Sequence, residues 1–379
     1  MSPVALPGPT VDKCHDNREG EKVPLTISVI ITSYNYEQYI GAAIDSVLAQ
    51  TRLPDEIIVI DDGSTDGSRA KIASYGDRIR AIFQKNEGIP AIWNTGYAHS
   101  GGDLVIFFDA DDILYPRALE LAEKAFKPGV AKVQFELDVI DQDGGLLGRR
   151  YCNFAAGINE LETAMEFSQT GTYLWPVTSG NVYARAFLER VMPAAPPVGI
   201  DGELNTIAPL YGKIATIIEP QGQYRIHLRN ISRIDKAGRI NIIPDFAERI
   251  RLRKLEFDLL RQNATRLNVA LPDIDFLDSE LVFVNYRLMA RKMRKEDGDD
   301  AKRSLANLWW TGMRIVSRSP LQTTTRLKHI VWLTALTVAP ASLAHLLIAI
   351  RFSRSHLQST LRSWLASSSG RGLSSKSSD

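Results

Sequence analysis

The sequence predicts an α/β fold whose core is a doubly wound sheet. The prediction depends on three short apolar runs in the first third of the chain, at Ile27–Thr32, Glu56–Ile60 and Asp103–Phe108. These runs are rich in β-branched and aromatic residues and do not alternate with polar ones, which is typical of parallel strands covered on both faces. The helices predicted between them, from the spacing of apolar residues and from residues typical of helix starts, are Tyr36–Gln50, Asp66–Ser74 and Pro90–His99. Strands and helices therefore alternate, as they do in a doubly wound sheet.

The composition fits a globular protein and excludes several functional classes. The 379 residues are 44% hydrophobic and 23% charged, which is ample material for a buried core. A net charge of +1 gives no chain-wide basic field, so we expect no nucleic-acid partner. The two cysteines, Cys14 and Cys152, exclude a disulfide framework and a cysteine-based zinc site. We therefore expect a protein of the reducing cytoplasm.

Changes of composition along the chain predict its organisation. Residues 1–24 are rich in Pro, Gly and charge and lack the apolar centre of a secretory signal, so we expect a disordered leader. Residues 25–240 are the predicted catalytic domain, and 241–366 a helical appendage. The Ser- and Gly-rich residues 367–379 are a predicted disordered tail.

Polar side chains gather where the three predicted strands end. The first strand continues into Thr32–Asn35, the second into Asp61–Ser64 and the third into Asp109–Asp112. In open α/β sheets, ligands bind outside the carboxyl ends of the strands. One such end could simply terminate a strand or cap a helix. Three in succession, with carboxylates that repel one another unless a cation is present, indicate a site.

The residue types at these ends suit a metal ion and a nucleotide. Asp109 and Asp111 lie at positions i and i+2 of an extended segment and face the same side, and their oxygen atoms suit Mg²⁺ or Mn²⁺. Tyr34 offers a ring for stacking, and Asp62 an acceptor for a base N–H or a ribose hydroxyl. No GxGxxG follows the first strand, no GxxxxGK[ST] occurs, and the DxD is not on the first strand as in a phosphoaspartate phosphatase.

In order along the chain, the motifs resemble the nucleotide-sugar-binding half of family 2 glycosyltransferases, which have the GT-A fold. The resemblance covers about Leu25 to Ser232. It implies a GT-A-type mixed sheet, a nucleotide-sugar donor with UDP favoured, Mn²⁺ or Mg²⁺, and inversion at the anomeric carbon. The motifs that carry it are ISVIITSYNYEQYIGAAIDSVLAQT, EIIVIDDGSTDGS and KNEGIPAIWNTGYAHSGGDLVIFFDADD.

The same resemblance assigns roles to individual residues. The donor-binding residues are Thr32, Tyr34, Asp62, Asn86, Asn94 and Asp109, and the metal ligands are Asp111, Asp112 and His227. The general base is Asp201, the second member of a Glu-Asp pair whose first position here holds Ile200. Glu203 is the alternative base. Trp93 departs from the family pattern, since many relatives carry a basic residue before the second Asn.

The resemblance implies single sugar additions to a hydroxyl of a glycan or a lipid-linked acceptor, in cell-surface polysaccharide or glycolipid synthesis. No Q-x-x-R-W run of the kind carried by processive members is present. Two alternatives stay open. A sugar-nucleotide nucleotidyltransferase would resemble G-x-G-x-R-L after the first strand, where this chain has Ser33–Asn35. A non-catalytic nucleotide-sugar-binding module would have no need of the DxD or of Asp201.

The last third of the chain is predicted to be helical and basic. Helices are expected at Phe246–Leu267 and Phe276–Met293, followed by a charged linker, Arg294–Lys302. From Lys302 onward there are eleven basic residues and one acidic residue, Asp379. Within Ile330–Ile350, sixteen of 21 residues are apolar, but Pro340 divides the run. This pattern favours a bent helical pair on the cytoplasmic face of a membrane, with tryptophans at headgroup level, over a buried helix or a true span.

Overall fold

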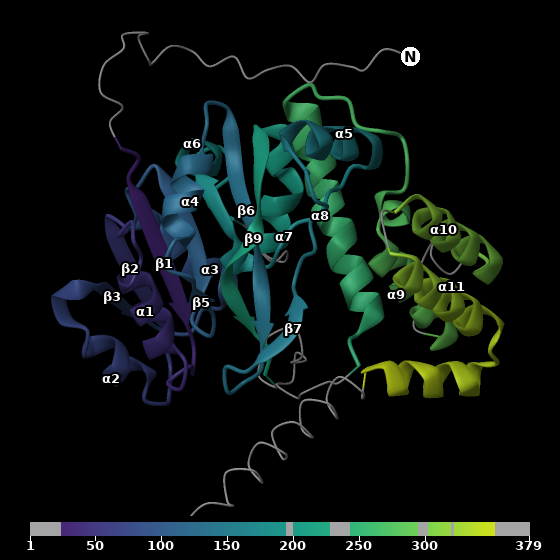
Figure 1. Ribbon diagram of the computed structural model, residues 1–379, viewed down its shortest axis with the longest axis horizontal. Coiled ribbons are helices and arrows are strands. Elements are labelled where there is room, and N and C mark those ends of the chain that lie inside the picture. Colours follow the sequence, from purple (N-terminus) through teal and green to yellow (C-terminus); the bar gives the residue numbers. More distant parts are fainter. Residues whose placement is uncertain (1–23, 195–199, 228–242, 295–301, 320–321, 353–379) are drawn as a thin grey trace, which may run out of the picture. The chain divides into compact units, whose positions relative to one another are not determined.

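The computed structural model describes residues 24–194, 200–227, 243–294, 302–319 and 322–352 (Figure 1). Almost all of the predicted leader, the interior of the charged linker and the predicted tail lie outside these residues. The chain divides into two compact units, one running to Ile226 and including Leu252–Phe276, the other comprising His227–Arg251 and the chain from Leu277 onward. The predicted boundary near residue 240 stays a prediction.

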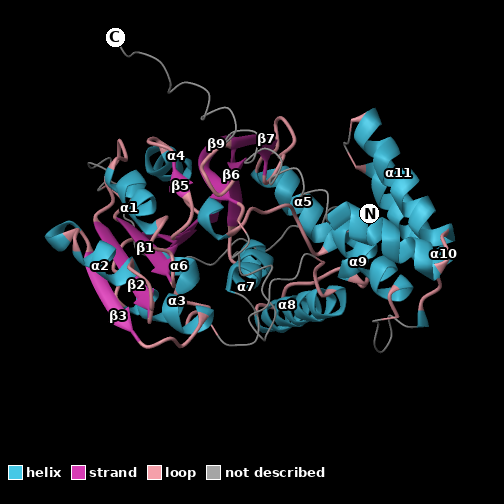
Figure 2. Ribbon diagram, turned by 90° about the horizontal axis from the view of Figure 1, so that it is seen from below, coloured by secondary structure: helices cyan, strands magenta, loops and turns pink. Residues whose placement is uncertain are grey.

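The first unit is built on one mixed sheet of nine strands. Figure 2 shows the parallel strands β3, β2 and β1 side by side. The strand order is β3-β2-β1-β4-β8-β6-β9-β5, with β7 paired to β6. The strands are β1 Ile27–Ser33, β2 Glu56–Asp62, β3 Arg80–Gln84, β4 Leu104–Asp109, β5 Ile113–Leu114, β6 Val130–Ile140, β7 Leu146–Arg150, β8 Asn181–Ala184 and β9 Lys213–Arg225.

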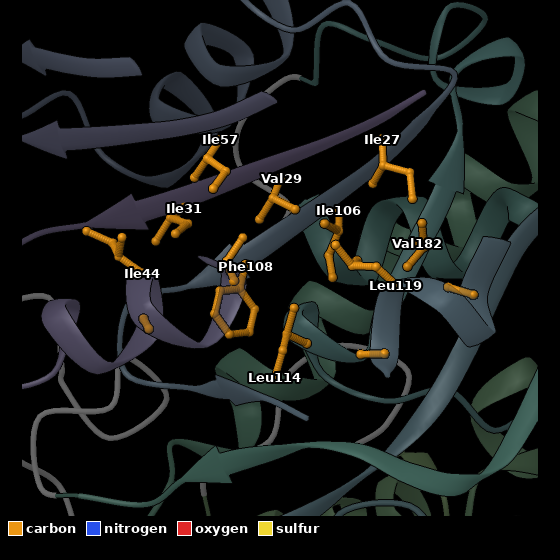
Figure 3. Close-up of a cluster of buried hydrophobic side chains, with 14 of the residues drawn as sticks. Ile27, Val29, Ile31, Ile44, Ile57, Ile106, Phe108, Leu114, Leu119 and Val182 are labelled. Atoms are coloured by element: carbon orange, nitrogen blue, oxygen red, sulfur yellow. The ribbon is translucent and has the colours of Figure 1, made fainter. Parts of the chain in front are cut away.

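Helices cover both faces of the parallel part of the sheet. Val29 and Ile31 of β1 point to the side on which Ile44 of α1 (Ile40–Leu48) and Leu119 of α4 (Ala118–Ala125) lie (Figure 3). The opposite face of β1 and β2 packs against α3 (Ile89–Ala98). The remaining helices of this unit are α2 Ser68–Ala73, α5 Glu160–Thr170, α6 Arg185–Leu188 and α7 Ile200–Ile207, joined by most of α8 Phe246–Arg266.

The predicted fold class is confirmed, with one correction to the strand count. The three predicted strands are β1, β2 and β4, and the mixed sheet carries helices on both faces. A further strand, β3, precedes β4, so the DxD follows the fourth strand rather than the third. The apolar pattern does not reveal β3 because it is an edge strand that carries Arg80 and Gln84 at its ends and leaves Phe83 exposed.

The second unit is helical. Its helices α9 (Leu281–Lys292), α10 (Leu305–Arg318) and α11 (Thr323–Val338) pack against one another, and residues 341–352 are helical too. The single helix predicted over 276–293 is instead a short 3₁₀ turn followed by α9, because Glu280 has an extended backbone. The predicted break at Pro340 is confirmed, since α11 ends before it.

The tryptophans of this unit differ from the expectation. The indole N–H groups of Trp309 and Trp332 donate hydrogen bonds to Thr334 Oγ1 (3.0 Å) and Asn285 Oδ1 (2.8 Å) within the unit. Among the described tryptophans, only Trp310 is exposed, at 66%. Across the described residues, no helix combines the length and the apolar character needed to cross a membrane.

The closeness of α3 to the sheet yields a stability prediction. A Cβ at Gly96 would press on Ile30 Cγ2 and lie 2.9 Å from Ile60 Cδ1. Because overpacking a core typically costs about 1–3 kcal/mol, we expect Gly96→Ala to lower the free energy of unfolding by that amount. Gly101→Ala is the matched control, since its Cβ would meet nothing closer than Glu56 Oε1 at 3.9 Å. Urea denaturation of both variants measures the difference, and equal stabilities would refute the packing argument.

Candidate active site

The sheet register brings the predicted donor residues to one edge. Thr32 of β1 lies opposite Asp109 of β4, and Ser33 lies opposite Asp61 of β2. The carboxyl ends of three adjacent parallel strands therefore meet, as the sequence predicts. Tyr34 follows β1 directly and is 44% exposed, so its ring is accessible at this edge.

Asp62 organises the loop that leads into α3. Its Oδ1 accepts hydrogen bonds from Gln84 Nε2 (2.7 Å) and from the Glu87 N–H (3.0 Å), and its Oδ2 accepts one from the Gly88 N–H (2.9 Å). Hydrogen bonds to an ionised carboxylate are among the stronger ones in proteins. Asp62 thus fixes the loop that carries Asn86, whose exposed side chain lies at the same edge.

The loops after β1 and β2 are tied to each other. Asn35 has a left-handed backbone, with φ of 59°, a conformation that Asn tolerates better than most residues. Its N–H donates to Ser64 Oγ (2.8 Å), and its Oδ1 accepts from the Thr65 N–H (2.8 Å). These bonds hold the segment around Tyr34 against the end of β2.

A cluster of carboxyl groups follows β4. Asp111 and Asp112 are buried, and burial raises the pKa of Asp112 and of Asp109 well above the ordinary range. The nearby charge of Asp111 raises the pKa of both carboxyls further. Asp112 Oδ1 accepts from the Arg225 N–H (2.9 Å), whereas its buried Oδ2 accepts no hydrogen bond from the residues that the structure describes. Ionising these carboxyl groups together is therefore unfavourable unless a cation is present.

Arg225 holds the backbone of this cluster, and the sequence analysis missed its role. Its Nε donates to the Asp111 carbonyl (2.8 Å), and its Nη1 to the carbonyls of Asp141 (3.3 Å) and Gln142 (3.2 Å). The guanidinium also stacks over the Tyr39 ring, 4.7 Å from its centre. Arg225 lies in the run Tyr224–His227, of which the sequence analysis selected only the histidine.

Two tyrosines that the sequence analysis did not select also border the cluster. Burial raises the pKa of Tyr36, and the charges of Asp111, Asp109 and Asp112 add to the effect. The pKa of Tyr224 is raised in the same way, by burial first and then by Asp112. Both phenols therefore keep their protons at neutral pH and can donate hydrogen bonds near the carboxylates.

The two candidate bases on α7 face different surroundings. The charge of Asp201 contributes to the raised pKa of Asp109, which places Asp201 near the DxD. Burial and the charge of Glu256 on α8 raise the pKa of Glu203 to about 7. Residues two apart on a helix project in different directions. The charge of Asp201 thus acts on Asp109, whereas Glu203 is affected by Glu256, and the assignment of the base to Asp201 stays a prediction.

Asn94 and His227 have contacts or positions that do not by themselves indicate their predicted roles. The Asn94 carboxamide makes two hydrogen bonds with the Ala194 backbone, donating to its carbonyl (2.9 Å) and accepting from its N–H (2.9 Å). It thereby holds the segment that leads toward α7. His227 lies two residues beyond the end of β9 and is grouped with the second unit. The roles of Asn94 in donor binding and of His227 as a metal ligand stay predictions.

The carboxyl groups after β4 fit a hard cation that takes part of its coordination from elsewhere. Among the described side chains, no three of the His, Cys, Asp and Glu type form a metal site by themselves. A magnesium-type site needs only one or two protein carboxylates when substrate phosphates and water complete it. The unpartnered Oδ2 of Asp112 and the carboxylate of Asp111 suit that arrangement.

The raised pKa of Asp112 predicts that its charge lowers the stability of the metal-free protein. A carboxyl whose pKa is raised by folding destabilises the fold increasingly as pH rises above its unfolded pKa. Asp112→Asn keeps the acceptor for the Arg225 N–H and removes the charge, so in metal-free protein we expect it to unfold at a higher temperature at pH 8. Each 1 kcal/mol corresponds to roughly 2–4 °C.

The gain should shrink toward pH 3, below the ordinary aspartate pKa of about 3.9, where the wild-type carboxyl is mostly protonated both folded and unfolded. Asp77→Asn is the control, since Asp77 is exposed. Thermal unfolding in a chelator at both pH values measures the effect. A variant less stable than the wild type at pH 8 would contradict the electrostatic explanation.

The chain is similar to known glycosyltransferases. The profile of the family described as Glycosyl transferase family 2 matches residues 28–190. An uncharacterized glycosyltransferase of Nostoc is 38% identical over 215 residues, 54% of this chain and 66% of that protein. The glycosyltransferase GlyA of Streptococcus pneumoniae is 27% identical over 244 residues, 60% of this chain and 34% of that protein. The matches therefore span just under two thirds of one relative and about a third of the other.

Solved structures are also similar. A TarS fragment of S. aureus in complex with UDP-GlcNAc is 16% identical, with a TM-score of 0.48 over 88% of this chain and 92% of that one. From the match to the family profile and the identity to these relatives, the chain carries a family 2 glycosyltransferase domain that includes residues 28–190.

Proposed function

We propose that this glycosyltransferase is metal-dependent and moves a sugar, with inversion, from a nucleotide diphosphate donor to an acceptor hydroxyl. The observation that carries the proposal is the position of Asp201, which is near enough to Asp109 to raise the pKa of that carboxyl. In this proposal, a base on α7 acts beside the carboxylates that follow the strands of the proposed donor site. Inversion needs one such base and no covalent intermediate.

Each part of the site has a role in this proposal. Thr32, Tyr34 and Asp62 bind the base and ribose side of the donor, with Asn86 and Asp109 along the same edge. Asp111 and Asp112 hold Mn²⁺ or Mg²⁺, with His227 as a further candidate ligand. A metal bound there would supply positive charge to the leaving diphosphate. Asp201 accepts the proton of the attacking hydroxyl.

The donor and acceptor are proposed more broadly. The family resemblance favours UDP as the nucleotide. The lack of a Q-x-x-R-W run favours single additions to a glycan or lipid-linked acceptor, in surface polysaccharide or glycolipid synthesis.

Two substitutions separate proton transfer from donor binding. Removing a positioned general base typically costs about 10²–10⁴-fold in rate, so Asp201→Asn should lose that much transfer or donor hydrolysis while UDP–Mn²⁺ binding persists. Asp111→Ala should lose the metal-dependent part of UDP binding. Turnover of radiolabelled UDP-, GDP- and dTDP-sugars with Mn²⁺ and calorimetry with UDP measure both effects. Near-normal turnover by Asp201→Asn would reject Asp201 as the base.

The same incubation distinguishes the alternatives. Release of free sugar from the donor supports a transferase. Release of pyrophosphate would support a nucleotidyltransferase instead, and complete inertness toward all three donors would support a binding module.

We also propose that the second unit contacts the cytoplasmic face of an anionic membrane. Residues 302–352 contain no Asp or Glu. Leu327, Val331 and Val338 are exposed on α11 at spacings of four and seven residues, which place them on one side of the helix. Lys328 of the same helix is exposed, and so is the basic residue Arg351 farther along the chain. Apolar side chains combined with basic ones are typical of helices that lie in a membrane interface.

Liposome flotation tests this contact with surface substitutions rather than truncation, because Leu333 and Leu336 of α11 are buried. The full chain should float with vesicles of phosphatidylcholine and phosphatidylglycerol at low salt, and less at high salt. Val331→Glu with Val338→Glu should abolish flotation. Leu161→Glu, at a residue of α5 that is 69% exposed, should not. If the full chain stays in the soluble fraction at low salt, the membrane contact is refuted.

A further inference from the structure

Lys132 is a buried amine in the middle of the catalytic unit. It lies on β6 with no exposed surface, and its Nζ donates to Asn181 Oδ1 (3.0 Å) and to Asn205 Oδ1 (2.7 Å). Within the described part of the chain it has no carboxylate partner at ion-pair distance. Burying a lysine without a counter-charge is costly, and an apolar side chain would usually stabilise such a position better. Its presence therefore calls for a reason other than stability.

The first of its two partners supports the turn beneath the DxD. Asn181 begins β8, and its Nδ2 donates to the carbonyls of Val177 (2.8 Å) and Thr178 (3.3 Å). The turn so fixed carries Ser179, whose Oγ accepts a hydrogen bond from the Asp109 N–H (3.1 Å). From Lys132, a short chain of hydrogen bonds and backbone thus reaches the end of β4.

The second partner belongs to the helix of the proposed base. Asn205 is four residues after Asp201 on α7 and therefore lies one helical turn along the same side. Two tyrosines also hold it: Tyr183 donates to Asn205 Oδ1 (3.2 Å) and Tyr173 to its carbonyl (2.8 Å). The Lys132 amine lies 5.0 Å from the centre of the Tyr173 ring.

We propose that Lys132 is a positioning residue for sugar transfer, whose amine fixes the base helix relative to the turn that supports the DxD strand. The inference rests on the proposed function, in which Asp201 must meet an acceptor held against the donor. Productive geometry has to be kept within about 0.5 Å, and a misplacement of 1 Å can cost about 10²-fold in rate. One amine that reaches both elements is a direct way to hold that separation.

The protonation of Lys132 agrees with a geometric role. Burial lowers the pKa of this amine well below its ordinary range. In either protonation state the amine has at least two N–H donors, which is enough for the two carboxamide oxygens around it. The side chain can therefore bridge the two elements whether or not it carries a charge.

The test uses two variants and a control. Lys132→Met removes the amine, which leaves Asn181 Oδ1 without this donor and Asn205 Oδ1 with Tyr183 as its donor, so it should lower stability. The double variant Lys132→Met with Asn205→Leu replaces both partners of the Lys132–Asn205 hydrogen bond by apolar groups and should recover part of that stability. Gln134→Leu is the control, because Gln134 is a buried polar residue two positions along the same strand that bonds to Leu174 and Thr216 instead of α7.

Three measurements on the full-length protein decide the matter. In the double variant, we expect UDP–Mn²⁺ binding within about twofold of the wild type, and hydrolysis of the accepted sugar nucleotide with kcat at least 10-fold lower and KM nearly unchanged. Amide hydrogen exchange of α7 should be about 10-fold faster, while that of β1 and β4 is unchanged. The control should match the wild type in all three.

The proposal is overturned if the double variant regains stability and kcat together, or if the exchange of α7 is unaltered. Failure of the proposed function is a different result. In that case the wild type turns over none of the UDP-, GDP- and dTDP-sugars, while the exchange of α7 still reports whether Lys132 holds the helix.

Discussion

Three carboxyl groups in four consecutive residues, where β4 ends, impose the constraint on which the rest of the catalytic unit depends. Asp111 and Asp112 are buried, and burial, followed by the charge of Asp111, raises the pKa of the Asp109 and Asp112 carboxyls. An arrangement of this kind persists only when the surrounding structure holds it in place. Ser179 and the Arg225 side chain serve that purpose by binding the backbone of Asp109 and Asp111, and the Arg225 N–H binds the Asp112 carboxylate itself.

The supporting contacts come from distant parts of the chain. Arg225 reaches Asp111 and Asp112 across more than a hundred residues of sequence, and Ser179 reaches Asp109 across seventy. Asp62 performs the equivalent task on the donor side by holding the loop before α3. Polar side chains that bond to the backbone in this way fix the positions of the strand-end residues, while Tyr34 stays exposed beside them.

Much of the fold could be predicted from the sequence because its parallel strands are covered on both faces and therefore appear as continuous apolar runs. The strand β3 could not, since an edge strand with Arg80 at one end has no such run. The strand-end residues of the site could be predicted too, because they directly follow the apolar runs that reveal the strands. Arg225, Tyr36 and Lys132 were not, because their roles follow from tertiary contacts that no local pattern encodes. In the second unit, the helices could be predicted from the spacing of apolar residues, but the hydrogen bonds of Trp309 and Trp332 within the unit could not.

Buried polar residues also fix the two halves of the first unit relative to each other. The donor half is a set of apolar strands whose register is fixed by burial. The helix α7, which carries the proposed base, comes from the other half of the unit, and Lys132 and Tyr183 hold it by directional bonds to Asn205. Hydrophobic contact is non-directional and would allow the helix to slide by fractions of an ångström. Hydrogen bonds to two carboxamides do not, so the buried amine lies where it would limit the displacement of the proposed base from the proposed donor site.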